Sequence, residues 1–374
     1  MKRLRAVCVF GTRPDAIKMA PVVRELRSAE EVWDVRTIVT GQHREQLDQV
    51  LGIFGITPDV DLAIMQPGQS LTAITTRALA GLDHALAAWP PDVVLAQGDT
   101  TTTFTAALAA FYNRVPFGHV EAGLRTGMIY DPFPEEMNRR LVAGLATWHF
   151  APTEDARRNL LAEGIPSDRI DVTGNTGIDA LVSVARMDGI DEDPGVERLG
   201  LGDSPIVLIT AHRRENLGEP LAAICRAVRQ LAHLFPETQF VYAMHKNPLV
   251  RETVIRELNG IRNVHLVEPP AYGPFIKLMQ RSLLILTDSG GIQEEAPSLG
   301  RPVLVLRRTT ERPEGVEAGA TRLIGTQTET IIQETRSLLE DQGAYTRMQV
   351  SQNPYGDGQA AVRIRSRLET EIGR

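Results

Sequence analysis

Short apolar runs alternate with longer amphipathic segments along the whole chain of 374 residues. Several runs are apolar almost throughout, as expected of parallel strands that are covered on both faces. The predicted strands are 6–10, 35–40, 93–96, 116–120 and 147–151, then 206–210, 240–244, 264–268, 283–287 and 303–306. Helical spacing predicts helices at 71–88, 102–111, 219–234 and 249–258. This repetition of strand and helix indicates right-handed crossovers and an α/β fold with doubly wound sheets.

The length and a restart of the pattern near Ile206 predict two domains, because a single core rarely organises so many residues. We expect two Rossmann-like domains with an interdomain cleft. The first would span 1–173 and the second 174–357, with a hinge at Gly174–Gly177. A terminal segment, 358–374, carries apolar residues at helical spacing, and we expect this helix to complete the first domain.

Composition narrows the class of protein. The formal net charge of -7 argues against a nucleic-acid partner, because nucleic acids attract basic surfaces. No apolar stretch approaches the roughly 18 residues of a membrane span, and the one near the N-terminus is shorter than a signal-peptide core. Cys8 and Cys225 are expected to be buried thiols in a reducing compartment. We therefore predict a cytoplasmic protein without a membrane partner.

The first predicted strand leads into Gly11-Thr12-Arg13-Pro14, with Lys18 one turn further on. Open α/β sheets bind ligands at the carboxyl ends of their strands, where helix amides and cations suit a diphosphate. An ordinary loop with two surface cations explains the same spacing equally well. The segment lacks the Gly-x-Gly-x-x-Gly fingerprint, so a nicotinamide cofactor has no support, and we predict no cofactor.

Acidic residues follow other strands of the first half. Asp99 and Glu121 come just after two predicted strands, and Glu135 with Arg139 begins a predicted helix. Carboxylates beside cations can be tuned for proton transfer. Taken alone, Glu135 is better explained as a favourable acidic residue in a first helical turn, and Glu135 with Arg139 as a surface pair.

In the second half, His212 and His245 each follow a predicted strand and lie beside cations. A single histidine is usually structural, but two at equivalent strand ends are candidates for contact with phosphate. Their spacing matches no zinc pattern, and we predict no metal. Ser289-Gly290-Gly291 joins a strand to a helix, and its amides suit a diphosphate. Glu295 is placed to accept hydrogen bonds from ribose hydroxyls, and Arg312 adds a cation.

Taken in order, these segments resemble the non-hydrolysing UDP-N-acetylglucosamine 2-epimerases. The matching motifs are Gly11-Thr12-Arg13-Pro14, Gly98-Asp99-Thr100, Glu121-Ala122-Gly123-Leu124-Arg125, Pro134-Glu135-Glu136, His212-Arg213-Arg214-Glu215, Asp288-Ser289-Gly290-Gly291 and Thr310-Glu311-Arg312-Pro313-Glu314-Gly315-Val316. The resemblance implies a GT-B-like fold and a homodimer.

The resemblance also implies roles. The implied catalytic residues are Asp99, Glu121, Glu135, Arg139 and His212. The implied substrate-binding residues are Arg13, Lys18, His245, Phe275, Ser289, Gly290, Gly291, Glu295 and Arg312, with Phe275 near the uracil. The substrates would be UDP-N-acetylglucosamine and UDP-N-acetylmannosamine, interconverted through loss of UDP, a 2-acetamidoglucal intermediate and re-addition.

Some members of the family bind a second substrate molecule as an activator. Gln42, His43, Arg213 and His245 match positions of that accessory site, whereas Glu45 and Gly68 replace a usual Gln and Arg. Losing a cation and gaining an anion should weaken diphosphate binding, so we predict weak or absent activation. Asp15 and Arg308 also depart from the usual family residues, Glu and an Asp or Asn respectively.

Three other functions fit parts of the pattern. A retaining glycosyltransferase of the same fold would also use a Gly-Gly turn and a nearby Glu, but would not need the acid/base cluster. A hydrolysing epimerase would release N-acetylmannosamine and UDP, and it often carries a fused kinase domain, which we do not expect here. A catalytically silent nucleotide-sugar sensor would not need every matched carboxylate.

Overall fold

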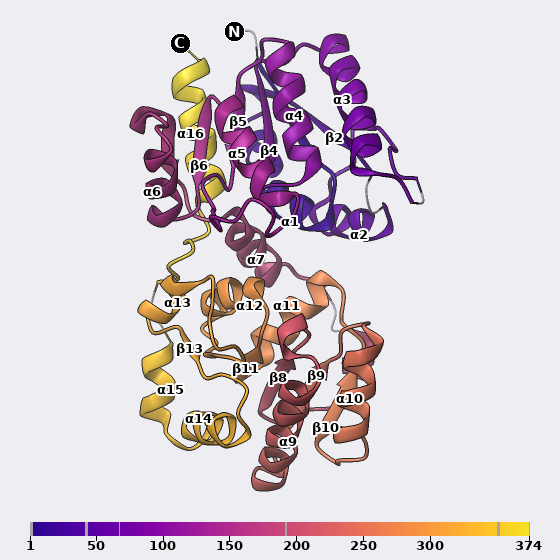
Figure 1. Cartoon of the computed structure of the whole chain (residues 1–374), viewed down its shortest axis with the longest axis vertical. Helices are drawn as coiled ribbons and strands as arrows, with labels where there is room; N and C mark the ends of the chain where they lie inside the picture. Colours follow the sequence, from indigo (N-terminus) through magenta and orange to yellow (C-terminus); the bar gives the residue numbers. More distant parts are fainter. Residues whose placement is uncertain (1–2, 42–43, 67, 191–192, 350–351, 374) are drawn as a thin grey trace. The chain divides into compact units, whose positions relative to one another are not determined.

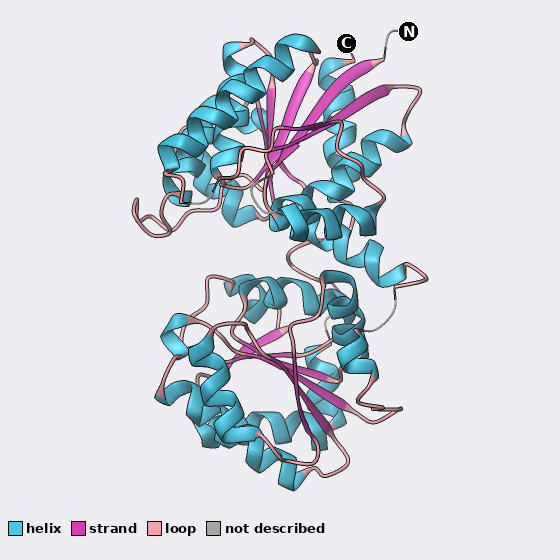
Figure 2. Ribbon diagram, turned by 90° about the vertical axis from the view of Figure 1, so that its right-hand side faces the viewer, coloured by secondary structure: helices cyan, strands magenta, loops and turns pink. Residues whose placement is uncertain are grey.

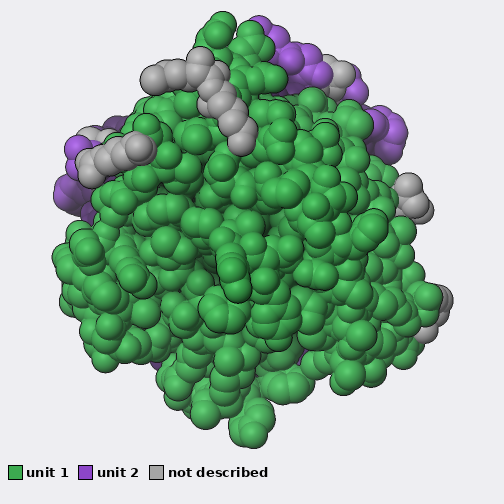
Figure 3. Space-filling view, turned by 90° about the horizontal axis from the view of Figure 1, so that it is seen from above, with its two compact units in different colours: residues 1–180, 356–374 green, residues 181–355 purple. Residues whose placement is uncertain are grey.

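The computed structural model describes residues 3–41, 44–66, 68–190, 193–349 and 352–373, with only the backbone of 44–46. The chain divides into two compact units (Figures 1 and 3). Unit 1 consists of Met1–Ala180 and Gly356–Arg374, and unit 2 consists of Leu181–Tyr355. The division falls inside one helix, α7 (Thr176–Arg186), and the candidate hinge at Gly174–Gly177 overlaps the start of that helix.

Within the described residues, unit 1 contains a seven-stranded parallel sheet in the order β3-β2-β1-β4-β5-β6-β7. Its strands are β1 (Leu4–Phe10), β2 (Trp33–Val39), β3 (Val60–Asp61), β4 (Val93–Gln97), β5 (Phe117–Val120), β6 (Trp148–Ala151) and β7 (Ile170–Val172). Its other helices are α1 (Arg13–Ser28), α2 (Arg44–Phe54), α3 (Leu71–Ala88), α4 (Thr101–Tyr112), α5 (Glu135–Leu145), α6 (Glu154–Ala162) and α16 (Ala360–Ile372). This strand order is that of a Rossmann sheet. Successive strands are added on one side of β1 and then, from β4 onward, on its other side.

Unit 2 repeats this order with six parallel strands among its described residues, β10-β9-β8-β11-β12-β13. The strands are β8 (Ile206–Thr210), β9 (Gln239–Ala243), β10 (Val264–Val267), β11 (Leu284–Thr287), β12 (Val303–Val305) and β13 (Thr321–Leu323). The helices are α8 (Pro194–Glu197), α9 (Glu219–Leu234), α10 (Pro248–Leu258), α11 (Tyr272–Arg281), α12 (Gly290–Glu295), α13 (Pro313–Glu317), α14 (Thr328–Glu340) and α15 (Gln342–Met348). In this sheet the order of strand addition reverses between β8 and β11.

Helices cover both faces of each sheet (Figure 2), which explains why the strands are apolar throughout. In unit 1, Val7, Val9 and Val94 pack in one cluster with alanines of α4. In unit 2, Val207 and Ile209 pack with Leu231 and other residues of α9. Both cysteines are buried and unoxidised, and burial raises the pKa of each thiol to about 12.

The predicted α/β class with two doubly wound sheets is confirmed. The sequence pattern did not predict three strands, β3, β7 and β13. They lie at the edges of their sheets and contain too few residues to show a periodicity. The terminal helix α16 belongs to unit 1, where Arg365 pairs with Glu25 of α1 at 3.2 Å and Glu369 accepts from Trp33 Nε1 at 3.0 Å. Within the described ranges, no helix combines the length and apolarity needed to span a membrane.

Candidate active site

The candidate residues gather at the two points where the strand order reverses. In unit 1 the segments after β1 and β4 carry Arg13 and Asp99, and in unit 2 the segments after β8 and β11 carry His212 and Ser289. Neighbouring connections leave such a point in opposite directions, which opens a crevice at the carboxyl ends of the strands. Each unit therefore presents polar groups where a doubly wound sheet ordinarily binds its ligand.

Asp15 organises the first segment. It is 3% exposed, and its Oδ2 accepts hydrogen bonds from the amides of Gly11 and Thr12 at 3.2 and 3.1 Å and from Thr100 Oγ1 at 3.2 Å. Thr12 caps α1 in return, so the two residues form a capping box. Burial raises the pKa of Asp15 to about 6, although the hydrogen bonds oppose it. The Asp15 carboxylate is thus a structural anchor that orients the segment carrying Arg13.

The packing around Gly11 leaves no room for a side chain. A Cβ at this position would lie 2.3 Å from Oγ1 of both Thr40 and Thr102. Those two hydroxyls hydrogen-bond each other at 2.9 Å in the interior. A glycine is therefore needed for β1 to turn directly into α1.

Glu121 contacts side chains from two other elements of unit 1, α1 and β4. It forms an ion pair with Lys18 of α1, and its Oε1 accepts from Gln97 Nε2 at 2.9 Å. Its backbone φ is 60°, a left-handed conformation that costs a non-glycine residue on the order of 1–3 kcal/mol. The structure thus brings together two residues from different segments, Lys18 and Glu121, that the sequence placed only near the same sheet edge.

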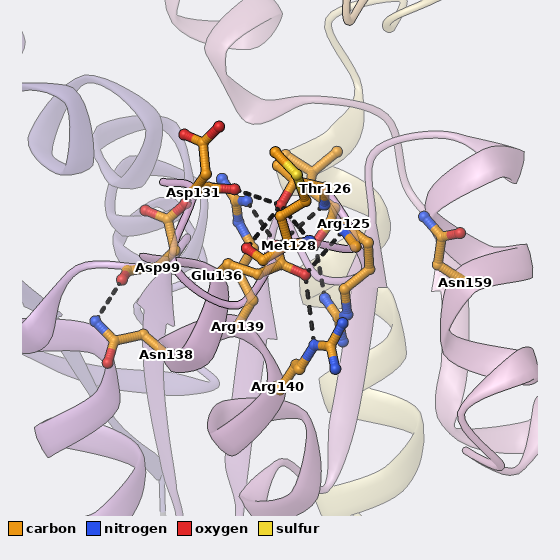
Figure 4. A network of polar contacts seen from close by, with 12 residues as sticks. Asp99, Arg125, Thr126, Met128, Asp131, Glu136, Asn138, Arg139, Arg140 and Asn159 are labelled. Carbon is orange, nitrogen blue, oxygen red and sulfur yellow. Dashed lines mark hydrogen bonds and ion pairs between the residues drawn. The ribbon is translucent and has the colours of Figure 1, made fainter. Parts of the chain in front are cut away.

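Asp99 lies beside a second cation (Figure 4). Its Oδ2 is 2.6 Å from Nη2 of Arg139, whose Nη1 is 3.1 Å from Glu136. Glu136 is fully buried and accepts from the amides of Thr126 and Gly127 at 3.0 and 3.3 Å. Burial opposes its ionisation, but these amides and Arg139 outweigh that effect and lower the pKa of the carboxyl. Buried Glu136 therefore holds Arg139 in place against Asp99.

Glu135 is the first residue of α5 and is half-buried. Its sequence neighbour Glu136, rather than Glu135, makes the ion pair with Arg139. The i, i+4 pairing of Glu135 with Arg139 that the sequence allowed is thus replaced by an i, i+3 pair, because Arg139 also reaches Asp99.

In unit 2, Asp288 anchors the segments that follow β8 and β11. It is fully buried after β11, and its Oδ2 accepts from the amides of His212 and Arg213 at 2.8 Å each and from Asn216 Nδ2 at 2.9 Å. Its Oδ1 is 3.6 Å from His212 Nδ1. One carboxylate therefore fixes the segment after β8 against the segment after β11.

The two predicted histidines lie face to face. The rings of His212 and His245 are stacked, with centroids 4.9 Å apart and an angle of 11° between their planes. His245 Nδ1 accepts from the amide of Asn247 at 3.1 Å, which leaves Nε2 as the ring's outward donor. Burial lowers the pKa of His212, an effect that Asp288 partly opposes.

Two guanidinium groups flank the Ser289-Gly290-Gly291 turn. A Cβ at Gly290 would lie 3.5 Å from Nη2 of Arg213 and 3.8 Å from Nη2 of Arg312. Arg312 is held by an ion pair with Glu294 of α12. Ser289 precedes α12, and its amide donates to Thr287 Oγ1 at 3.0 Å. The turn therefore offers backbone groups and two cations at one place, a suitable setting for a diphosphate.

The remaining candidates of unit 2 lie on neighbouring elements. Glu295 ends α12, and Phe275 lies half-buried in α11. Of the accessory-site candidates, Arg213 lies beside Gly290, whereas Gln42 and His43 lie outside the described residues. In the part of the chain that the structure describes, no group of three His, Cys, Asp or Glu side chains is arranged to hold a metal ion.

The sequence patterns assign no catalytic or binding role to several residues that build this site. They are Asp15, Gln97, His119, Glu136, Asn138 and Asp288, and each makes contacts that orient a candidate residue or its backbone. Most of them are polar residues inside or next to elements that the pattern predicts to be buried. A polar residue at a buried position needs a partner, which is the one signal that could have found them.

Comparisons with known proteins agree on one family. A family model described as UDP-N-acetylglucosamine 2-epimerase matches residues 24–369. A UDP-N-acetylglucosamine 2-epimerase of Salmonella typhimurium is 53% identical over 372 residues, which cover 98% of this chain and 99% of the relative. One of Escherichia coli K12 is 52% identical over 372 residues, covering 98% of each chain.

Solved structures give the same result. That of UDP-GlcNAc 2-epimerase from Neisseria meningitidis bound to UDP-GlcNAc has a TM-score of 0.85 and 50% identity, and covers 98% of this chain and 100% of that one. The Methanocaldococcus jannaschii enzyme in complex with UDP-GlcNAc and UDP has a TM-score of 0.76 and 31% identity, with coverage of 98% and 100%. The predicted GT-B-like fold is confirmed by such neighbours. On its sequence, its fold and its candidate site, the chain belongs to the UDP-N-acetylglucosamine 2-epimerase family.

Proposed function

We propose that the chain interconverts UDP-N-acetylglucosamine and UDP-N-acetylmannosamine without hydrolysis. The observation that carries this proposal is the pair of carboxylates in unit 1, each beside a cation. Asp99 pairs with Arg139, and Glu121 pairs with Lys18, at the ends of adjacent strands. Relatives solved with UDP-GlcNAc support the choice of substrate.

The hydrogen at C2 of the sugar has no neighbouring carbonyl, so its direct removal is difficult. In the proposed reaction the bond from C1 to the UDP oxygen breaks and its electron pair leaves with the diphosphate. A base removes the C2 proton, and a C1–C2 double bond forms, giving 2-acetamidoglucal. Re-addition of UDP with protonation from the other face gives the epimer. The reaction is redox-neutral overall, which is why we propose no redox cofactor.

Unit 2 would stabilise the departing diphosphate. Arg213 and Arg312 beside Gly290 supply positive charge, and the Ser289-Gly290-Gly291 turn supplies backbone groups. Stabilising a developing negative charge with fixed donors is usually the largest contribution to such catalysis. Glu295 and Phe275 would hold the ribose and the uracil, and His212 and His245 would contact the diphosphate or its leaving oxygen.

Unit 1 would handle the proton. Inversion requires one group on each face of C2, and Asp99 and Glu121 offer two carboxylates held by different partners. Glu135, at the start of α5, is the third candidate, while Arg13 and Lys18 would contact the substrate from unit 1. We also propose that the domains correspond to residues 1–173 with 358–374 and to 174–357, and that the active form is a cytoplasmic homodimer.

One experiment tests the reaction against its rivals. The protein is incubated with UDP-N-acetylglucosamine in heavy water without an acceptor, and the products are followed by NMR. Interconversion with deuterium at C2 is expected. Release of free N-acetylmannosamine would identify a hydrolysing enzyme, and an unchanged substrate would favour a glycosyltransferase or a sensor.

A further inference from the structure

Three consecutive backbone carbonyls at the end of β4 each accept a hydrogen bond from a side chain of a different element. Thr103 of α4 donates to the carbonyl of Gln97 at 2.6 Å. His119 of β5 lies 2.7 Å through Nε2 from the carbonyl of Gly98. Asn138 of α5 donates to the carbonyl of Asp99 at 2.8 Å (Figure 4). We call these three donors the carbonyl clamp.

The clamped segment contains one candidate catalytic carboxylate, Asp99, and contacts a second, Glu121. Asp99 belongs to the segment itself, and Gln97 reaches out of it to donate to Glu121 at 2.9 Å. Gly98 between them has a φ of 76°. Glycine has more backbone freedom than other residues, so contacts from neighbouring side chains are needed to hold this conformation. A shift of this segment would therefore move Asp99 and, at the same time, the Gln97 amide that donates to Glu121.

His119 can serve only as a donor in this position. It is 1% exposed, and its Nε2 faces a carbonyl oxygen, which cannot donate, so Nε2 carries the hydrogen. Its Nδ1 has no hydrogen-bond partner among the described residues. Burial lowers the pKa of His119 to about 4, so the ring is neutral near pH 7. Neither nitrogen is exposed for proton exchange with a substrate, which separates His119 from the acid/base groups.

We infer that His119, with Thr103 and Asn138, is a positioning residue that sets the geometry of Asp99 and Glu121 for proton transfer at C2. This inference rests on the proposed function. It assigns to the carbonyl clamp a part in the rate of the chemical step and no part in nucleotide binding.

The test compares four variants with the wild-type enzyme. His119→Phe keeps a ring of similar volume but removes the donor, and His119→Gln restores a donor near the position of Nε2. His149→Phe is the matched control, because His149 is also 1% exposed and is the register partner of His119 on the next strand. Thr103→Val removes another clamp donor, the Thr103 hydroxyl, with little change of shape. Deuterium incorporation at C2, kcat, KM and the Kd for UDP are measured for each.

We expect His119→Phe to lower kcat and the rate of deuterium incorporation by about 10² -fold, as for a misplacement of a catalytic group by about 1 Å. KM and the Kd for UDP should stay within about twofold, and His119→Gln and His149→Phe should keep most of the wild-type kcat. An equal loss in His149→Phe, or full activity in a folded His119→Phe, would overturn the inference. If His119→Phe does not fold, Thr103→Val decides: a lowered kcat with unchanged Kd supports the clamp, and an unchanged kcat refutes it. Failure of the wild-type enzyme to exchange C2 would instead refute the proposed function.

Discussion

The side chains of Lys18 and Glu121 form an ion pair although the two residues are 103 positions apart in sequence. Both are partly shielded, with 25% and 10% of their side-chain surface exposed. We expect Lys18→Met to lower the rate of C2 deuterium exchange by roughly 10²-fold, because Glu121 then loses the cation that orients it. Steady-state assays with NMR detection measure the change.

A second ion pair on the same helix provides the control. Arg27 of α1 pairs with Asp59 at 3.1 Å, and both side chains are about a third exposed. Such surface pairs are worth only about 0.2–1 kcal/mol, so Arg27→Met should keep full activity. Equal activity of Lys18→Met and Arg27→Met would contradict a role for Lys18 in the reaction.

Replacing Asp288 by Ala should strongly destabilise unit 2. The change leaves two backbone amides and Asn216 without their shared acceptor, and each unsatisfied buried donor costs about 1–3 kcal/mol. We expect a loss of more than about 3 kcal/mol in urea unfolding. Asp193 caps the short helix α8, and Asp193→Ala should cost only about 1 kcal/mol. Similar losses in both variants would mean that Asp288 is not the anchor described above.

Arg312→Ala should weaken UDP binding by about 10- to 100-fold, because one charge-assisted contact to a phosphate contributes about 1.5–3 kcal/mol. Arg308→Ala removes the same charge from an exposed side chain nearby and should change the Kd by less than about twofold. Isothermal titration with UDP distinguishes the two. If both variants bind UDP as the wild type does, Arg312 does not hold the diphosphate.

The buried ring of His149 should make the protein less stable in mild acid. Burial lowers its pKa to about 3, whereas the unfolded chain takes up the proton near the ordinary value of 6.5. The unfolded state therefore binds more protons between these values, and stability falls as the pH decreases through this range. Between pH 7 and pH 5 the loss from this residue is about 2 kcal/mol. His149→Phe should reduce the pH dependence of urea unfolding by that amount, and an identical dependence would contradict the assignment.

The sequence departures at Glu45 and Gly68 predict a hyperbolic rate curve for this enzyme. Gln42→Ala should leave the curve unchanged if the accessory site does not bind a second substrate. The double variant Glu45→Gln with Gly68→Arg introduces the residues expected from the resemblance and should introduce sigmoidal behaviour. A Cβ at Gly68 would meet no atom within 4 Å, although its φ of 68° makes the arginine mildly strained. A sigmoidal wild-type curve that Gln42→Ala abolishes would show that activation survives these departures.

The pattern located most strands because central parallel strands are continuous apolar runs. Ile206–Thr210 was predicted with its exact bounds, whereas the two-residue strand β3 has no periodicity to detect. The division into two units falls inside the continuous helix α7, where no loop composition marks it in the sequence.

The candidate site was predictable where residues follow strands and unpredictable where they act through long-range contacts. Asp99 and Glu121 were found because the carboxyl ends of parallel strands meet at one edge. His119 lies inside a strand, and its partner Gly98 is 21 positions away, so no local spacing marks it. The sequence does not distinguish Glu136 from Glu135, because helical spacing does not show which of two adjacent acidic residues faces the interior. The difference depends on contacts of Glu136 with Arg139 and with the amides of residues 126–127.

The left-handed backbone of Glu121 has a consequence for engineering this enzyme. A glycine there would relieve the strained conformation and would remove the carboxylate at the same time. Screens that select for heat resistance alone would therefore accept a change that removes the carboxylate proposed for proton transfer. Thermal stability and turnover should be scored separately at this position, because the fold and the chemistry favour different residues there.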